Sequence, residues 1–206
     1  MYQRFFKRFL DIVLSFLALV ILAVPMLIFA IIIKLDSKGP VLFWQKRAGL
    51  HKKHFMMPKF RSMYTETPSD IPTHLLTDPG QWITPVGKVF RKLSIDELPQ
   101  IFCILTGKMS IIGPRPALWN QFDLIVERDK YGANDVRPGL TGWAQINGRD
   151  ELEIPVKAKL DGEYVKNISF FFDCKCFFGT ILAVLRLDGV VEGGTGAMKK
   201  ENEESK

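Results

Sequence analysis

The architecture follows first from the segment IVLSFLALVILAVPMLIFAIII, residues 12–33. Its 22 positions contain no charged side chain, and Ser15 is the only polar one. At about 1.5 Å per helical residue, the segment is long enough to cross a hydrocarbon core roughly 30 Å thick. Lys34, Asp36 and Lys38 follow it directly, whereas a signal peptide would end in a small-residue cleavage site. The sequence therefore predicts a membrane element that is retained.

Pro25 lies inside this segment and removes the helical hydrogen bond to the Ile21 carbonyl, so we expect a kink or a break there. Two arrangements fit the pattern. One is a re-entrant helix with both ends on one side of the bilayer, and the other is a kinked helix that spans it. Basic residues flank the segment on both sides, so the distribution of positive charge does not choose a crossing direction.

The rest of the chain has the composition of a water-soluble domain. The net charge of +6 favours anionic partners, namely nucleic acid, acidic lipid headgroups or phosphorylated small molecules. We expect no nucleic-acid binding, because the cations are dispersed and no recognised binding motif is present. The three cysteines are odd in number and lack metal-ligand spacing, which favours a reducing, cytosol-facing domain over a disulfide framework or a zinc site.

Periodicity predicts a mostly helical α/β domain with a small amount of β structure. Short strands are expected at residues 41–44 and 54–57, and helices at residues 98–105, 119–129 and 170–187. The last of these is amphipathic and rich in Phe, with Ser169 as its expected N-cap. It either packs on the core or lies in the membrane interface. Residues 65–80 read as an exposed loop, and residues 137–149 as a loop with a short strand.

Two adjacent carboxylates stand out in the segment LSIDELPQ, residues 93–100. Ser94 and Glu97 have the spacing of a capping box and Pro99 suits a first turn, so a purely structural helix start is one interpretation. The chemical interpretation makes Asp96 a nucleophile or metal ligand, with Glu97 helping to hold Mg²⁺. The residues alone leave both interpretations open.

Basic side chains suited to phosphate occur in three further segments. Lys59 and Arg61 would share one face of a strand. Arg115 stands between two prolines that fix the backbone around its guanidinium. Arg137 and Arg149 bound a stretch with amide and hydroxyl donors and an aromatic ring, a mixture that nucleotide recognition would need.

Five segments occur together in a fixed order: the apolar block with Pro25, KFRSM (59–63), LSIDELPQ (93–100), MSIIGPRP (109–116) and RPGLTG (137–142). In this combination the chain resembles the bacterial sugar transferase family, specifically its small monotopic phosphoglycosyl transferases. The resemblance runs from about Tyr2 to Leu187. Two departures are Val24, where the family often has Ser before the kink proline, and Lys108, where it often has an acid.

The resemblance implies a two-step reaction. Asp96 would attack the β-phosphate of a UDP-sugar, release UMP and hold the phosphosugar until undecaprenyl phosphate accepts it. Asp96 and Glu97 would bind Mg²⁺ as the cofactor. The residues expected to bind substrate are Lys59, Arg61, Arg115, Arg137, Arg149 and Asp161.

The resemblance also implies an organisation. Residues 1–38 would form a re-entrant membrane helix kinked at Pro25, and residues 39–191 a catalytic domain with amphipathic interfacial helices. Residues 192–206, rich in Gly, Lys and Glu, have too little apolar surface to fold and are expected to form a disordered tail. The domain would lie on the cytosolic face of the cytoplasmic membrane and contact phospholipid. A homodimer is a further possibility. Two rivals are a magnesium-dependent lipid phosphotransferase without a covalent intermediate and a non-enzymatic, membrane-tethered assembly protein.

Overall fold

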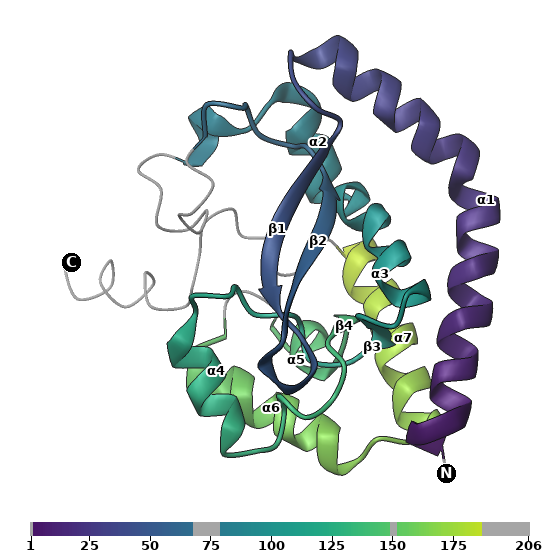
Figure 1. The fold of residues 1–206 in the computed structure, drawn as a ribbon, viewed down its shortest axis with the longest axis vertical. Helices are drawn as coiled ribbons and strands as arrows, with labels where there is room; N and C mark the ends of the chain where they lie inside the picture. The colour runs from purple at the N-terminus through teal and green to yellow at the C-terminus, as the bar shows by residue number, and fades with distance from the viewer. Residues whose placement is uncertain (1, 68–78, 149–151, 187–206) are drawn as a thin grey trace.

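Helices dominate the computed structural model, which describes residues 2–67, 79–148 and 152–186 (Figure 1). In chain order the elements are the π-helical turn η1 (Tyr2–Phe6), α1 (Lys7–Asp36), β1 (Leu42–Ala48), the 3-10 turn η2 (Leu50–Lys52), β2 (His54–Phe60), η4 (Pro79–Trp82), α2 (Pro85–Lys92), η5 (Ile95–Gln100), α3 (Ile101–Leu105), β3 (Ser110–Ile112), α4 (Phe122–Asp129), β4 (Gly139–Thr141), α5 (Trp143–Ile146), α6 (Ile154–Lys166) and α7 (Phe170–Arg186). The mostly helical α/β class is confirmed. Arg149, residues 68–78 of the expected loop and the expected tail 192–206 lie outside the described residues.

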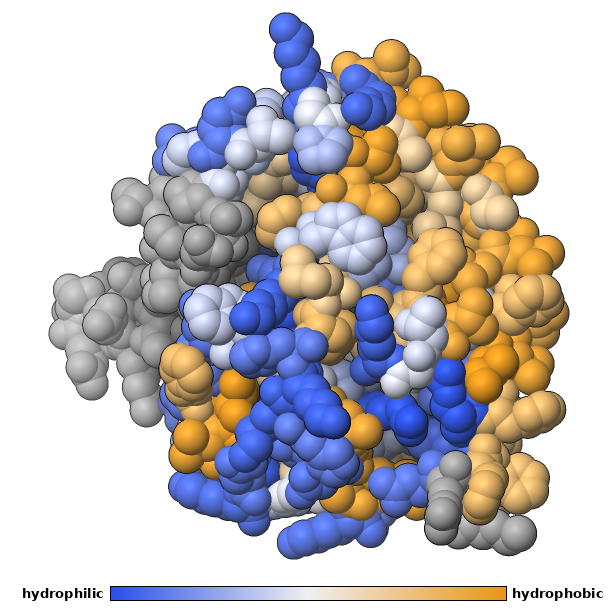
Figure 2. Space-filling view, viewed as in Figure 1, coloured by the Kyte–Doolittle hydropathy of each residue, from blue (hydrophilic) through white to orange (hydrophobic). Residues whose placement is uncertain are grey.

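Helix α1 contains the apolar segment and continues through Pro25 without ending. Figure 1 shows it bending as it runs along one side of the domain. Its most apolar 18-residue window has a mean hydropathy of 3.2, and its length and composition suffice to cross a membrane. The residues Ile21 and Val24 are 72% and 66% exposed. Figure 2 shows apolar side chains gathered over this side of the molecule, so α1 presents a broad apolar face outward.

The first turns of α1 are fixed to the domain by polar contacts. Lys7 Nζ lies 2.6 Å from Asp173 Oδ2 on α7. The Arg8 guanidinium donates to the Ile104 and Leu105 carbonyls at the end of α3, at 2.6 and 2.8 Å. Asp11 is buried and accepts hydrogen bonds from the Ser110 hydroxyl at 3.1 Å and the Ile111 amide at 2.9 Å in β3. The N-terminal end of the membrane element is therefore tied to α7, α3 and β3.

The other end of α1 is fixed by Arg61. Its guanidinium donates to the carbonyls of Ser37, Lys38 and Pro40 at 2.7, 2.8 and 2.7 Å. These carbonyls follow the last turn of the helix, where backbone acceptors lack helical partners. The expectation that Arg61 shares a phosphate-binding face with Lys59 is therefore corrected: its buried side chain holds the exit of α1.

The exit of α1 leads directly into the antiparallel hairpin β1–β2, in which Phe43 pairs with Lys59 and Lys46 with Met56. Both strands lie where short strands were expected and are longer than predicted. Side chains alternate between the two faces of such a hairpin. Lys46 lies on the outward face with its Nζ 4.8 Å from the Trp119 ring, while Lys59 is directed to the opposite face.

A second, parallel strand pair, β3–β4, brings two of the sequence motifs together. The Gly113 amide donates to the Thr141 carbonyl, and the Gly139 amide donates to the Pro114 carbonyl, each at 2.8 Å. A Cβ at Gly139 would lie 2.1 Å from the Gly113 nitrogen, and one at Gly142 would lie 2.2 Å from the Gly113 oxygen. These glycines permit the close approach that fixes the Gly113–Pro116 loop.

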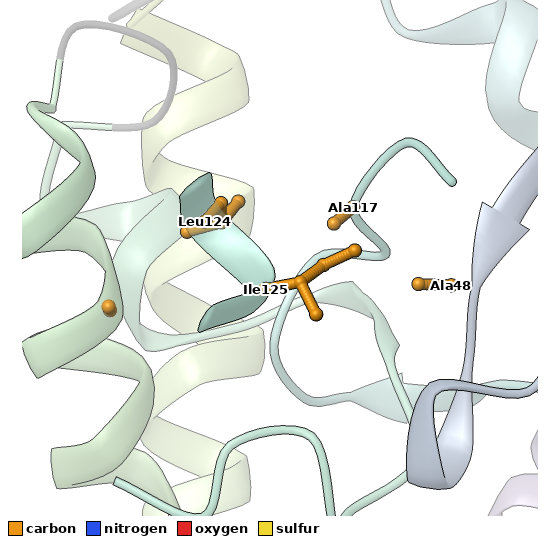
Figure 3. Packing of buried hydrophobic residues seen from close by; sticks show 5 residues of the cluster. Ala48, Ala117, Leu124 and Ile125 are labelled. Atoms are coloured by element: carbon orange, nitrogen blue, oxygen red, sulfur yellow. The ribbon is translucent and has the colours of Figure 1, made fainter. Parts of the chain in front are cut away.

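The remaining helices cover this framework. Figure 3 shows Ile125 of α4 pointing toward Ala117 and Ala48, which joins the end of β1 to the helical layer. Helix α7 begins as expected, because the Ser169 hydroxyl accepts a hydrogen bond from the Phe172 amide at 3.3 Å. One side of α7 is buried at Cys176, while Phe171 on another side is 82% exposed. This amphipathic helix therefore packs one face on the core and presents the other face outward.

Candidate active site

The two adjacent carboxylates lie in the first turn of η5, and both are buried. Ser94 precedes them in the left-handed region, with φ of 56° and ψ of 22°, and its side chain makes no capping hydrogen bond to the helix. The capping-box interpretation of Ser94 and Glu97 is therefore wrong. The left-handed conformation of Ser94 costs conformational energy. It turns the backbone so that both carboxylates enter the domain beside β2.

Glu97 is held by two cations. Lys59 Nζ on β2 lies 3.1 Å from Glu97 Oε1. The Arg115 guanidinium donates to both Glu97 oxygens, with Nη1 at 3.3 Å from Oε2 and Nη2 bound to Oε1. Arg115 reaches this position because Pro114 and Pro116 restrict the loop that β3 and β4 anchor. The structure thus brings together three of the predicted site residues from segments far apart in the sequence.

Asp96 has looser contacts than its neighbour. Its Oδ2 lies 3.9 Å from Lys59 Nζ. Burial raises the pKa of Asp96; the positive charge of Lys59 opposes this shift, the Glu97 carboxylate adds to it, and Arg91 and Arg115 oppose it. A carboxylate beside Lys59, and close enough to Arg91 and Arg115 to be affected by their charge, is a side chain that can act as a nucleophile.

Lys59 itself is mostly covered by the protein. Burial lowers the pKa of its ammonium group, and the carboxylates of Glu97 and Asp96 counteract that shift. Two further arginines act on this region and were not among the residues predicted to form the site. Arg47 donates to the Pro116 carbonyl at 2.9 Å and so braces the Arg115 loop, and Arg91 lies at the end of α2, close enough to affect the ionisation of Asp96.

Other predicted substrate-binding residues lie elsewhere. Arg137 is exposed and donates through Nε to the Gly107 carbonyl at 3.0 Å, near the end of α3. Asp161 is 1% exposed and accepts from the Arg128 guanidinium at 2.8 and 2.6 Å. The Asp161 assignment is corrected, because this carboxylate is enclosed between α4 and α6. Arg137 lies at the end of α3, and its role in substrate binding stays a prediction. Arg149 lies outside the described residues.

Asp161→Ala is expected to destabilise the protein by about 3–5 kcal/mol, because Arg128 would remain buried without its counter-charge. For a chain of this size, that corresponds to a fall in Tm of roughly 6–20 °C. Thermal unfolding of the detergent-solubilised protein measures the change. Lys130→Ala is the control, since Lys130 pairs with Glu127 at the surface and is 61% exposed. Equal Tm values for the two variants would contradict a structural role for Asp161.

The acidic side chains at the site allow a test of whether Mg²⁺ fits. No group of three or more His, Cys, Asp or Glu side chains suited to a metal occurs within residues 2–67, 79–148 and 152–186. Mg²⁺ does not need such a cage, since it is commonly held by one or two carboxylates, water and substrate phosphate oxygens. Asp96 and Glu97 provide two hard oxygen donors side by side, a set that fits a cation shared with a diphosphate.

Comparison with known proteins identifies the family. A family model described as bacterial sugar transferase matches residues 2–187, which include every element of the fold described above. The chain belongs to the bacterial sugar transferase family. Three of the five segments that carried the resemblance, residues 59–63, 93–100 and 109–116, supply Lys59, Asp96, Glu97 and Arg115, which this sugar transferase brings together.

Curated relatives extend the comparison. The transferase is 41% identical over 184 residues to the uncharacterized sugar transferase EpsL of Bacillus subtilis, covering 89% of each chain. It is 43% identical over 188 residues to an undecaprenyl-phosphate glucose phosphotransferase of Komagataeibacter xylinus, covering 85% of this chain and 35% of that relative. It is 40% identical over 187 residues to the UDP-glucose:undecaprenyl-phosphate glucose-1-phosphate transferase of Escherichia coli, covering 87% and 40%. This transferase therefore spans less than half the length of the last two relatives.

Proposed function

We propose that this transferase moves a sugar 1-phosphate from a UDP-sugar to undecaprenyl phosphate, giving a polyprenyl diphosphate sugar and UMP. The observation that carries the proposal is the buried Asp96–Glu97 pair held against Lys59 and Arg115. The names of the related phosphotransferases from Komagataeibacter xylinus and Escherichia coli support the donor and acceptor classes. The reaction is the first membrane step of surface glycoconjugate synthesis.

The two carboxylates have different roles in this proposal. Both oxygens of Glu97 accept hydrogen bonds from cations, so this residue positions Lys59 and Arg115. The ion-pair contact of Asp96 within residues 2–67, 79–148 and 152–186 is the longer one to Lys59, at 3.9 Å, and we assign its oxygens to the attack on phosphorus. Asp96 is therefore the nucleophile and Glu97 the partner that holds the surrounding charges.

The reaction proceeds in two displacements at one phosphorus. An Asp96 carboxylate oxygen bonds to the β-phosphorus of the donor while the bond from that phosphorus to the bridging oxygen breaks, and UMP leaves with the electron pair. A phosphate oxygen of the acceptor then bonds to the same phosphorus, and the bond to Asp96 breaks to restore the carboxylate. Lys59 and Arg115 stabilise the charge that accumulates on the non-bridging and leaving oxygens.

Mg²⁺ is part of the proposal and would be held by Asp96 and Glu97 together with phosphate oxygens of the substrate. When bound, it supplies positive charge that neutralises the diphosphate and orients it for displacement. Lys59 and Arg115 act on the same oxygens from the hairpin and from the Gly113–Pro116 loop. Their attachment to Glu97 keeps both cations in place between the two half-reactions.

A re-entrant arrangement of α1 is the membrane topology that we propose. Both ends of the helix contact the same domain, through Lys7 at the start and through Arg61 at the exit. A helix with its ends on opposite sides of a bilayer would need that domain on both sides. The exposed apolar face of α1 then faces lipid, and Phe171 and Phe178 of α7 add an interfacial contact. The catalytic domain lies on the cytosolic face, where a soluble donor meets a lipid acceptor.

The decisive experiment separates the two half-reactions. Purified protein in detergent is mixed with Mg²⁺ and each member of a panel of UDP-sugars, first without acceptor. We expect a burst of about one UMP per enzyme with the correct donor, followed by multiple turnovers once undecaprenyl phosphate is added. UMP release only in the presence of acceptor would favour direct displacement, and no release with any donor would favour the non-enzymatic assembly protein.

A further inference from the structure

Two segments of the chain connect the members of the Glu97–Arg115 ion pair to one tight turn. The first arm, residues 97–105, runs from η5 through α3, and the second arm, residues 110–115, runs from β3 into the loop that carries Arg115. The turn between them is closed by two backbone hydrogen bonds to the Cys103 carbonyl, of 2.9 and 3.0 Å. The two arms therefore meet at the turn and again at the ion pair.

The two arms also pack on each other. Cys103 and Ile104 of α3 lie in one buried cluster with Met109 at the start of the second arm, and Ile111 of β3 packs against this cluster. Protein interiors are close-packed, so a displacement at the turn is passed along the arms instead of being absorbed. The position of the turn therefore affects the geometry of the ion pair at the other end of both arms.

Two side chains of α1 hold the turn ends of both arms. The Arg8 guanidinium donates to the carbonyls of the last two residues of α3, through Nη1 at 2.6 Å and Nη2 at 2.8 Å. Asp11 Oδ1 accepts hydrogen bonds from the Ser110 hydroxyl at 3.1 Å and the Ile111 amide at 2.9 Å. Arg8 and Asp11 are three residues apart, so they lie on the same side of the helix. Figure 1 shows α3 beside α1. This Arg8–Asp11 clamp fixes both arms to the start of the membrane helix.

Asp11 occupies a costly position for a charge. It is 4% exposed and stands directly before the apolar segment, whose first residues, Ile12 and Val13, are 40% and 36% exposed. A buried carboxylate needs hydrogen bonds to offset its loss of water. Asp11 receives them from β3, which belongs to the second arm. The start of the apolar segment is thereby linked directly to the strand that leads to Arg115.

We propose that Arg8 and Asp11 are positioning residues, which act through the two arms to place Arg115 against Glu97 for the first half-reaction. This inference rests on the proposed function and concerns a cation that serves its donor. Loss of the clamp would let the turn move away from α1, and the Arg115 guanidinium would shift relative to the diphosphate. A misplacement of about 1 Å at a reacting centre can cost about 10²-fold in rate. The membrane helix then contributes to catalysis as well as to attachment.

The contacts of β4 have a different effect from the clamp. They join β3 and its loop to the parallel neighbour, for example through the bond from the Gly113 amide to the Thr141 carbonyl, and so fix the shape of the loop. These bonds do not involve α3, so the relation between the two arms depends on the turn and the clamp. The rival interpretation, in which Arg8 and Asp11 only attach α1 to the domain, predicts a loss of stability and no effect that depends on Arg115.

A double-mutant cycle tests the assignment. With donor alone, Asp11→Ala should slow the UMP burst by about 10- to 100-fold. In an Arg115→Met background the same substitution should slow the burst by less than about twofold, because the group that Asp11 positions is then absent. Asp11→Asn should recover most of the rate, since its amide oxygen can accept both hydrogen bonds from β3. Rapid mixing at saturating donor measures each rate.

Ser15→Ala is the matched control. Ser15 is buried on α1 one turn beyond Asp11, and its hydroxyl donates to the Ile12 carbonyl of its own helix at 3.2 Å. This variant should leave the burst within about twofold of wild type, because no arm depends on that hydrogen bond. Equal losses from Asp11→Ala in both backgrounds, or no loss in the wild-type background, would overturn the assignment, since Asp11 would then only attach α1 to the domain.

A second variant keeps the test valid if Asp11→Ala does not fold. Ser110→Ala removes one of the two donors to Asp11 from the β3 side, and it should slow the burst by about three- to tenfold, again only when Arg115 is present. The same loss in the Arg115→Met background would overturn the assignment. A wild-type protein without any burst would refute the proposed covalent reaction itself, which separates the two failures.

Discussion

Asp96→Asn is expected to lower UMP release by about 10⁴-fold or more and to leave no phosphosugar attached to the protein. Asparagine keeps the size of the side chain but lacks the anionic oxygen that bonds to phosphorus. The rate is measured with the correct UDP-sugar, Mg²⁺ and undecaprenyl phosphate. Intact-protein mass spectrometry after incubation with donor alone reports whether the adduct forms.

Two comparisons make this result specific to Asp96. Asp135→Asn makes the same chemical change at a side chain that is 70% exposed, and it should leave the rate unchanged. Glu97→Gln should slow the reaction while the adduct still accumulates on Asp96, because Glu97 positions cations and does not attack. An adduct mapped to Glu97, or normal turnover by Asp96→Asn, would refute the assignment of the nucleophile.

Arg115→Met should reduce the rate of the UMP burst by about 10²–10³-fold, the usual loss when one preorganised charge stabiliser is removed from a reacting centre. Arg115→Lys should recover only part of this rate, because an ammonium group cannot reproduce the two-pronged contact of a guanidinium with a carboxylate. Rapid mixing with donor alone measures the burst without any contribution from the acceptor.

A suitable control for Arg115 is Lys46→Met, which removes a cation from the outward face of the same hairpin that carries Lys59. It should leave the burst rate within about twofold of wild type, since surface cations away from the site are screened by solvent. Full recovery of the rate by Arg115→Lys would show that a positive charge alone is sufficient at this position. The proposed need for a guanidinium bound to both Glu97 oxygens would then be refuted.

The sequence predicted two features best: the long apolar helix and the charged residues of the candidate site. The apolar block predicted α1, because nothing but a membrane or a core accepts so many apolar side chains in succession. Asp96, Glu97, Lys59 and Arg115 were all predicted as site residues, and the structure places them together. The capping-box reading failed because it depended on one backbone conformation, and Ser94 adopts a different one.

Long-range partners were harder to predict. Arg61, Arg137 and Asp161 have the residue types of a phosphate site, yet each finds its partner in the fold: backbone carbonyls for the two arginines and Arg128 for the aspartate. Such contacts join residues more than 20 positions apart, so spacing along the chain cannot reveal them. Only the tertiary structure decides whether a cation meets a carbonyl, a carboxylate or a ligand.

Three helices, α2, α5 and α6, were also not predicted, although local signals exist for the first and the last of them. Thr84 followed by Pro85 is a favourable cap and first residue, and it starts α2. Pro155 stands in the first turn of α6 in the same way. Recognition of the first signal would have placed Arg91 on a short helix just before Asp96, the carboxylate whose ionisation it affects.

The polar contacts at the start of α1 can form only after their partners later in the chain have been synthesised. Lys7 emerges 166 residues before its partner Asp173, and Asp11 emerges 99 residues before Ser110. At about 5–20 residues per second, Lys7 waits roughly 8–33 s for its partner. Helix α1 is thus complete before the contacts that hold its first turns can form. If a ribosome stalls before it reaches α7, helix α1 is complete, but Lys7 in its first turn still lacks its partner Asp173.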